Sequence, residues 1–210
     1  MRDKAAALAA LQARIAPCRR CVEAGLLAAA NPVAGARGPA NAWLMLIGQA
    51  PGRLSVQRGI PFGGPGGVVL DRWLTRAGFP PNYLRSGTYL TALTRCFPGK
   101  AASGKGDRAP SPAEIALCRP WLEAEFALID PRVVLPIGQM AIRAFLGPGL
   151  LERFVGEVIE RDNRLWVPLP HPSGVSRWLN DPIHQAQVDR ALAALSALRE
   201  RFMPKQWAES

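Results

Sequence analysis

The chain has 210 residues, of which 49% are hydrophobic, so it is large enough for one well-buried core and rather small for two. We therefore expect a single domain over residues 1–210. Its 26 Lys and Arg against 16 Asp and Glu give a formal net charge of +10, which favours a polyanionic partner such as nucleic acid, because neutralising phosphates releases counterions. The alternative is that an Ala- and Arg-rich composition alone produces this charge.

Residues 3–16 have an amphipathic helix pattern with charges throughout. A signal peptide or a membrane span needs an uncharged apolar run, so we expect neither, and we expect a cytoplasmic protein without membrane contact. Residues 17–40 are rich in Pro, Gly and Ala, which predicts a loop. Residues 1–40 should thus form an N-terminal helix and a loop ahead of the core.

Strand and helix patterns alternate from residue 43 onward. The apolar run 43–47 predicts a fully buried strand that ends at Gly48. Ser111-Pro112-Ala113-Glu114 is a capping box with proline at the first helical position, so a helix should begin there. The expected strands are 43–47, 88–93, 132–137 and 165–169; the expected later helices are 68–77, 111–129, 139–145 and 183–201, followed by a flexible tail at 203–210. This alternation predicts an α/β fold with a mainly parallel four-stranded sheet that helices cover on both faces.

The four cysteines are the next feature: Cys18 and Cys21 form a C-x-x-C pair, and Cys96 and Cys118 stand alone. Four sulfur ligands make up one complete tetrahedral thiolate set, and a C-x-x-C turn directs two of them at one ion or cluster. The alternatives are two disulfides or four unrelated buried thiols. The pattern therefore indicates a metal site, and its metal stays open at this point.

Three loop segments follow expected strands: 48–52, 96–99 and 170–173. In open α/β sheets the ligand site lies beyond the carboxyl ends of the strands. We expect these segments to converge on one cleft.

Four motifs in order resemble those of the uracil-DNA glycosylase superfamily, and the cysteine layout resembles its iron-sulfur branches, families 4 and 5. The motifs are Gly48-Gln49-Ala50-Pro51-Gly52, Gly59-Ile60-Pro61-Phe62-Gly63-Gly64, Thr91-Ala92-Leu93-Thr94-Arg95-Cys96 and His171-Pro172-Ser173. The resemblance covers about residues 15 to 180. It implies a three-layer α/β/α sandwich, a 4Fe-4S cluster on the four cysteines, and hydrolysis of the N-glycosidic bond of uracil in DNA at the bacterial nucleoid.

This chemistry needs an aromatic platform for the extracted base and donors for the charge that builds on the uracil ring. Phe62, between glycines, is the stacking candidate, although it could be an ordinary core residue. His171 and the amides of the first loop could donate to the uracil oxygens, and a neutral imidazole suffices; the alternative is a structural histidine at a strand end. The expected uracil-binding residues are Gly48, Gln49, Ala50, Phe62, Ala92 and His171, with His171 and Gln49 catalytic.

Two positions depart from the family pattern. Gln49-Ala50 stands where one branch has an acidic residue that directs water, and Ala92 stands where family 4 has an asparagine that reads uracil. The candidates to orient water are the Gln49 amide and, as weaker choices, Asp71 or Asp107. We expect a monofunctional enzyme driven mainly by charge stabilisation, with other deaminated bases also open as substrates. The alternative is a protein that binds or covalently captures uracil-containing DNA with little turnover; a zinc-binding nucleic-acid module is a third possibility.

DNA contacts are expected from loops 173–178 and 98–110. The expected DNA-binding residues are Arg53, Arg58, Lys105, Arg108, Ser173, Arg177 and Trp178. Trp178 could instead anchor its loop into the core. Loop 99–106 has the Walker A spacing, but Gly106 stands where the magnesium-binding Ser or Thr belongs and no helix follows, which argues against nucleotide hydrolysis. The expected partner is uracil-containing DNA, bound by a monomer.

Overall fold

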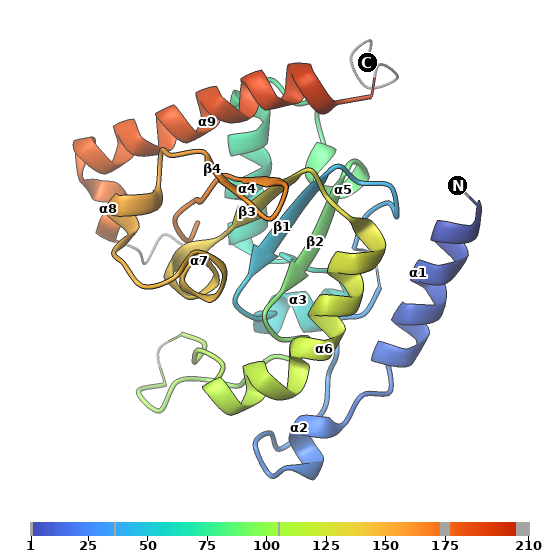
Figure 1. Ribbon diagram of the computed structural model, residues 1–210. Helices are drawn as coiled ribbons and strands as arrows, with labels where there is room; N and C mark the ends of the chain where they lie inside the picture. The colour runs from blue at the N-terminus through green and yellow to red at the C-terminus, as the bar shows by residue number, and fades with distance from the viewer. Residues whose placement is uncertain (1, 36, 105, 173–176, 205–210) are drawn as a thin grey trace.

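The computed structural model describes residues 2–35, 37–104, 106–172 and 177–204. Within them, five strands form one sheet in the order β2-β1-β3-β5-β4, seen at the centre of Figure 1. The strands are β1 (Leu44–Gly48), β2 (Thr88–Ala92), β3 (Val133–Pro136), β4 (Ile159–Arg161) and β5 (Arg164–Trp166). β2, β1, β3 and β5 run parallel, and β4 is antiparallel to β5.

Alternate side chains of β1 supply two separate cores. Leu44 and Leu46 join the core formed with the helices of one face, and Met45 and Ile47 join the core of the other. All five residues of β1 are buried, as the uninterrupted apolar run predicts for a central parallel strand. The sheet is therefore a middle layer between two helical layers, and the expected α/β/α fold is confirmed.

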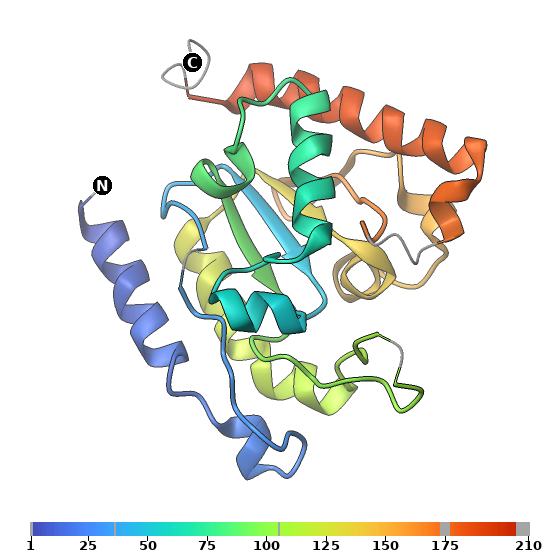
Figure 2. The same ribbon diagram turned by 180° about the vertical axis from the view of Figure 1, so that it is seen from behind.

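One helical layer holds α1 (Arg2–Ile15), α6 (Pro112–Ile129) and α7 (Gly138–Leu146), and the other holds α4 (Pro65–Arg76), α5 (Tyr83–Ser86) and α9 (Pro182–Phe202). Figure 2 views the second layer from its own side. The short helices are α2 (Arg20–Glu23), α3 (Arg53–Arg58), α8 (Leu151–Phe154) and the 3-10 helix η1 (Arg177–Asn180).

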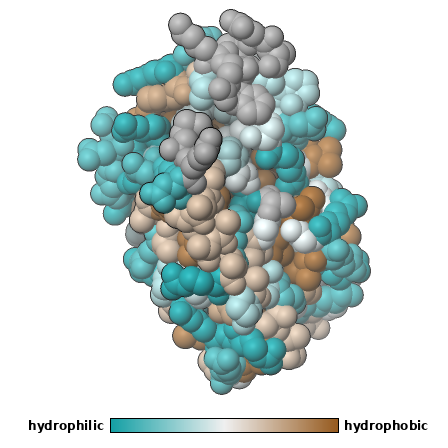
Figure 3. All heavy atoms as spheres, turned by 90° about the vertical axis from the view of Figure 1, so that its right-hand side faces the viewer, coloured by the Kyte–Doolittle hydropathy of each residue, from teal (hydrophilic) through white to brown (hydrophobic). Residues whose placement is uncertain are grey.

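α1 lies at the edge of its layer. It buries Leu8, Leu11 and Ile15, which share one helical face, and leaves small alanines outward. Figure 3 shows this side of the molecule, where weakly hydrophobic residues, in pale brown, lie among hydrophilic ones, in teal. Among the described helices, none combines the length and the apolar character that crossing a bilayer requires.

The expected count of four strands is wrong, because the sequence reasoning missed β4. β4 and β5 form a hairpin whose turn residues, Asp162 and Asn163, both have positive φ (52° and 58°), the backbone of a type I′ turn. β4 has three largely exposed residues and so carries no apolar alternation. The expected strand 165–169 is also shorter, although a parallel bridge between Ile137 and Leu169 continues its direction.

The capping box begins α6 as predicted. Ser111 Oγ accepts a hydrogen bond from the Glu114 amide at 3.2 Å, and Glu114 Oε2 accepts one from the Ser111 amide at 2.6 Å. This start fixes the helical phase that turns Cys118 inward, where it is buried. At the other end of the chain, α9 ends at Phe202, and residues 205–210 of the expected tail lie outside the described residues.

Candidate active site

The loop after β1 and the segment after β2 are joined by backbone hydrogen bonds. The Leu93 amide donates to Gly48 O at 2.9 Å, and the Thr94 amide donates to Gln49 O at 3.2 Å. These bonds continue the parallel pairing of the two strands beyond their ends. The first and third motifs therefore lie side by side, as the topology predicts.

His171 reaches the same edge of the sheet from β5. The Gly138 amide donates to Leu169 O at 2.8 Å, and a methyl group added at Gly138 would lie 3.3 Å from His171 Cβ. Because α7 begins at Gly138, its N-terminus, with the positive end of its dipole, lies beside His171.

His171 is exposed to solvent in part, and protein atoms surround the rest of its side chain. This partial burial lowers the pKa of His171 below its ordinary value of 6.5. The ring is therefore neutral at neutral pH and carries one N–H donor and one acceptor nitrogen.

Phe62 lies against the end of β1. A methyl group added at Gly48 would come within 2.8 Å of Phe62 Cζ, so the ring occupies the space that a side chain at Gly48 would need. Phe62 is half-buried and also packs against the core between the sheet and α4. Its φ of 50° lies in the left-handed region, which is uncommon for a residue with a large side chain. Both interpretations of Phe62 thus hold in part: it touches the core and presents an aromatic surface at the strand ends.

The two aspartates named as weaker water-orienting candidates lie in different places. A methyl group at Gly52 would come within 3.1 Å of Asp107 Oδ2, so the Asp107 carboxylate touches the first loop. Asp71 lies on α4, where its charge acts on Arg85 instead. An acidic group therefore reaches the first loop from a segment distant in sequence, although Gln49 and Ala50 supply none.

All four cysteines are free thiols and line one cavity between the N-terminal loop, the end of β2 and α6. The pKa of Cys21 is raised to about 11, mainly by burial and to a smaller extent by the charges of Cys118 and Cys96. Burial also raises the pKa of Cys96 and of Cys118, and Cys18 acts in the same direction on both. The thiols are thus close enough to oppose one another's ionisation.

Two N–H groups point at sulfur atoms of this cavity. The Arg95 amide donates to Cys118 Sγ at 3.2 Å, and Trp121 Nε1 donates to Cys18 Sγ at 3.3 Å. Such donors stabilise thiolates and tune bound iron-sulfur clusters. Over the described part of the chain, however, no group of three or more Cys, His, Asp and Glu side chains is arranged closely enough to hold a metal ion.

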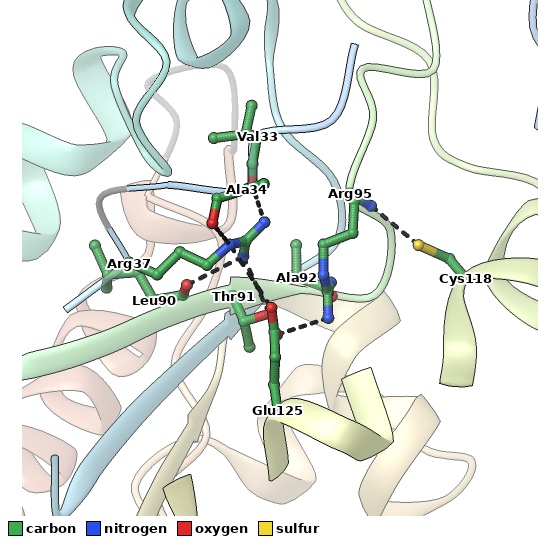
Figure 4. A network of polar contacts seen from close by, with 9 residues as sticks. All are labelled: Val33, Ala34, Arg37, Leu90, Thr91, Ala92, Arg95, Cys118 and Glu125. Carbon is green, nitrogen blue, oxygen red and sulfur yellow. Dashed lines mark hydrogen bonds and ion pairs between the residues drawn. The ribbon is translucent and has the colours of Figure 1, made fainter. Parts of the chain in front are cut away.

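A buried polar network lies next to the cysteines, and sequence reasoning missed it (Figure 4). Glu125 of α6 is fully buried and accepts hydrogen bonds from Arg95 Nη2 at 2.7 Å and from Thr91 Oγ1 at 2.5 Å. Arg37 Nε lies 3.7 Å from the other carboxylate oxygen. The sequence did carry a signal for this network. Glu125 lies on the same face of α6 as the buried residues Cys118 and Leu122, where a charged side chain needs a partner.

Arg95 connects this network to two parts of the candidate site. Its guanidinium donates to Ala92 O and to Glu125, while its amide donates to Cys118. Ala92, one of the expected uracil-binding residues, is 8% exposed. The main chain at Ala92 and the sulfur of Cys118 are thus both bound by Arg95.

Several residues expected to bind DNA contact other parts of the protein. Arg108 forms a two-pronged ion pair with Glu114 (2.6 and 2.8 Å), which holds the pKa of that carboxyl below its usual range. Arg58 Nη1 donates to Gly63 O at 2.5 Å. Arg53 and Arg58 are both exposed to solvent.

The loop after His171 is described only from Arg177, where η1 begins; Ser173 and Lys105 lie outside the described residues. Trp178 stacks on His184 with 4.1 Å between ring centroids and 3° between planes, and its Nε1 donates to Glu152 Oε1 at 2.7 Å. It also packs against the main core. The anchoring interpretation of Trp178 therefore matches its contacts.

The model of the uracil DNA glycosylase superfamily matches residues 36–196. The chain is 28% identical over 116 residues to a type-4 uracil-DNA glycosylase of Pyrobaculum aerophilum (55% of this chain, 54% of that protein) and 37% identical over 128 residues to a type-5 uracil-DNA glycosylase of Thermus thermophilus (56% and 55%). A type-4 enzyme of Thermotoga maritima is 28% identical over 116 residues (55% of each). The matches span about half the length of these curated relatives. Because the family model covers most of the chain, the chain belongs to the uracil DNA glycosylase superfamily.

Proposed function

We propose that this protein removes uracil from DNA by hydrolysing the N-glycosidic bond and leaves an abasic site. The observation that carries the proposal is the meeting of three motifs at the carboxyl edge of the sheet: the first loop, the ring of Phe62 on Gly48, and His171 beside the start of α7. Family membership and the type-4 and type-5 relatives support it. The substrate is uracil-containing DNA, bound by a monomer in the cytoplasm at the nucleoid.

In this proposal the flipped base stacks on Phe62 and its carbonyl oxygens face His171 and the amides of loop 48–52. Negative charge grows on the uracil ring as the glycosidic bond breaks. The neutral His171 N–H and the N-terminal end of α7 stabilise that charge, and partial exclusion of water strengthens both effects. Catalysis then depends mainly on charge stabilisation, and no lysine in these motifs acts as a nucleophile, so the enzyme is monofunctional.

Water is oriented by the Gln49 amide, with Asp107, whose carboxylate lies beside the first loop, as the second candidate. Asp107 is supported by the position of its carboxylate, which lies 3.1 Å from where a side chain on Gly52 would begin. Asp71 loses support, because its charge lies near Arg85.

Ala92 offers no side-chain hydrogen bond, so base reading relies on main-chain groups of the segment that Arg95 fixes. A site that lacks the asparagine amide rejects other bases less strongly. Hypoxanthine and xanthine are therefore also proposed as substrates, at lower rates than uracil.

We further propose that Cys18, Cys21, Cys96 and Cys118 hold a 4Fe-4S cluster. The donor set fits in residue type and number: four thiols line one cavity, oppose one another's ionisation, and receive N–H donors from Arg95 and Trp121, although among the described residues no three of them lie close enough to hold a single metal ion. When bound, the cluster supplies iron, whose positive charge offsets the negative charge of the four neighbouring thiolates. We propose that it stabilises the fold and takes no part in the chemical step. Visible absorbance with iron and sulfide analysis tests this: a colourless protein that contains zinc would contradict it.

For DNA contact we propose Arg53 and Lys105, with Ser173 and Arg177 following the histidine. Arg108 acts indirectly, because its ion pair with Glu114 shapes loop 98–110. Arg58 and Trp178 are proposed as supports of their loops, since both make internal contacts.

The test of the proposed function is incubation with single-stranded and duplex oligonucleotides that contain one uracil, hypoxanthine, xanthine or thymine. Strand breaks after alkali at uracil, absent with thymine and strongly reduced in His171→Ala, are the expected result. A protein–DNA band that survives denaturation, without alkali-labile product, would instead indicate covalent capture, the alternative that the missing acid at Gln49-Ala50 favours.

A further inference from the structure

Phe62 is held in a backbone conformation that it does not favour by itself. Its φ of 50° is left-handed, and such a residue persists only where the surroundings fix it. Gly67, in the first turn of α4, leaves room for this backbone, because a methyl group there would overlap the Phe62 carbonyl oxygen. The contacts around Phe62 therefore determine where its ring lies.

One side chain contacts two successive carbonyl groups of this segment. Arg85, on α5, donates from Nη1 to Pro61 O and from Nη2 to Phe62 O, the latter at 2.8 Å. A planar guanidinium with fixed N–H directions can hold both oxygens at once, whereas an ammonium group offers a single point. Arg85 is half-buried, and burial lowers its pKa while Asp71 acts in the opposite sense.

The next residue along the chain is held from the other side. The Gly63 amide donates to Ser55 Oγ at 3.0 Å, and Gly63 O accepts from Arg58. Both partners come from α3, which follows the first loop. The carbonyl groups of 61, 62 and 63 are thus all bound by arginines, and Arg85 holds the pair that defines the Phe62 backbone.

We propose that Arg85 is a positioning residue for base excision: by holding the carbonyls of Pro61 and Phe62, it keeps the Phe62 ring over Gly48, where the flipped base stacks. The inference rests on the proposed function. It assigns a basic residue near the site to the protein's own main chain and not to DNA phosphates. Loss of Arg85 lets Phe62 relax to negative φ, which turns the ring away from Gly48.

The experiment compares Arg85→Ala, Arg85→Lys and a matched control, Arg199→Ala, with wild type. Arg199, on α9, also donates to a backbone carbonyl, that of Gly78, at 2.7 Å. It makes the same kind of contact as Arg85 but not with the segment that holds Phe62. Single-turnover excision of uracil is measured at saturating enzyme, together with the affinity for an oligonucleotide that carries a tetrahydrofuran abasic analogue at about 50 to 200 mM salt.

We expect Arg85→Ala to slow excision by about 10- to 100-fold, as misplaced binding groups do. Affinity for the abasic analogue and its salt dependence should stay unchanged, because neither involves the base. Arg85→Lys should fall between Arg85→Ala and wild type, and Arg199→Ala should excise at the wild-type rate.

A double mutant keeps the test sharp even if Arg85→Ala alone is unstable. If Arg85 acts through Phe62, adding Arg85→Lys to Phe62→Leu should slow excision no further than Phe62→Leu alone. Additive losses, wild-type excision by Arg85→Ala, or a smaller salt slope that marks a lost phosphate contact would each overturn the inference. A wild type that releases no base overturns the proposed function and this inference with it, whereas an active wild type with unaffected Arg85 variants overturns the inference alone.

Discussion

Glu125 is predicted to be among the most important polar residues for stability. Its carboxylate is 0% exposed and faces two arginines, Arg95 at 2.7 Å and Arg37 at 3.7 Å, which are themselves 1% and 2% exposed. Glu125→Gln keeps the shape and removes the charge, so two buried cations lose their counter-charge. Breaking a buried ion pair from one side costs about 3–5 kcal/mol, against a total stability of about 5–15 kcal/mol for a typical protein.

Thermal and urea unfolding of the purified protein measure this loss. For a chain of this length, about 3–5 kcal/mol corresponds to a fall in Tm of about 6–20 °C. The matched control is Glu123→Gln on the same helix, whose ion pair with Arg119 is exposed (61% and 72%) and contributes at most about 0.5 kcal/mol. A Glu125→Gln protein whose unfolding free energy lies within about 1 kcal/mol of wild type would refute the reasoning, because the arginines would then have to be neutralised or solvated in another way.

Three further predictions follow. Because burial lowers the pKa of His171, the folded state binds fewer protons at this residue than the unfolded state does. The unfolding free energy of the protein should therefore fall as the pH drops below about 6.5, and His171→Gln should remove this part of the pH dependence in urea titrations. A difference between the two proteins that stays the same from pH 8 to pH 5 would contradict this expectation. Gly48→Ala should displace the Phe62 ring, since the methyl group would lie 2.8 Å from Cζ, and should abolish most single-turnover excision; Gly35→Ala, where no atom lies within 4 Å, is the control that should behave as wild type. Cys118→Ala should lower Tm and DNA affinity before it slows the chemical step, and a stable variant that binds DNA normally would argue against a structural role for the cysteines.

Features encoded by neighbouring residues were predictable from the sequence. The capping box at Ser111, the buried strand before Gly48 and the approach of the two strand-end loops all follow from local patterns that the fold preserves. Caps and buried runs depend on residues a few positions apart, and the two loops meet because neighbouring parallel strands bring their carboxyl ends to one edge of the sheet.

Features that depend on pairs distant in sequence were not predictable. The charge network around Glu125 joins residues that are 30 to 88 positions apart. The hydrogen bond of Arg85 to the Phe62 carbonyl joins residues that are 23 positions apart. β4 was missed because a three-residue exposed strand has no periodicity, and it is stabilised by its pairing with β5. Arg108 and Trp178 have the residue types of DNA contacts, but the structure directs them to Glu114 and His184.

The release of free base from DNA tests uracil excision by this protein directly. An oligonucleotide with one labelled uracil is incubated with wild type and with His171→Ala, and free uracil is quantified by chromatography. We expect several equivalents of uracil per wild-type protein and a rate in His171→Ala lower by about 100- to 1,000-fold, the usual cost of removing a donor to a developing charge. No free uracil from wild type, or equal release by both proteins, would contradict it.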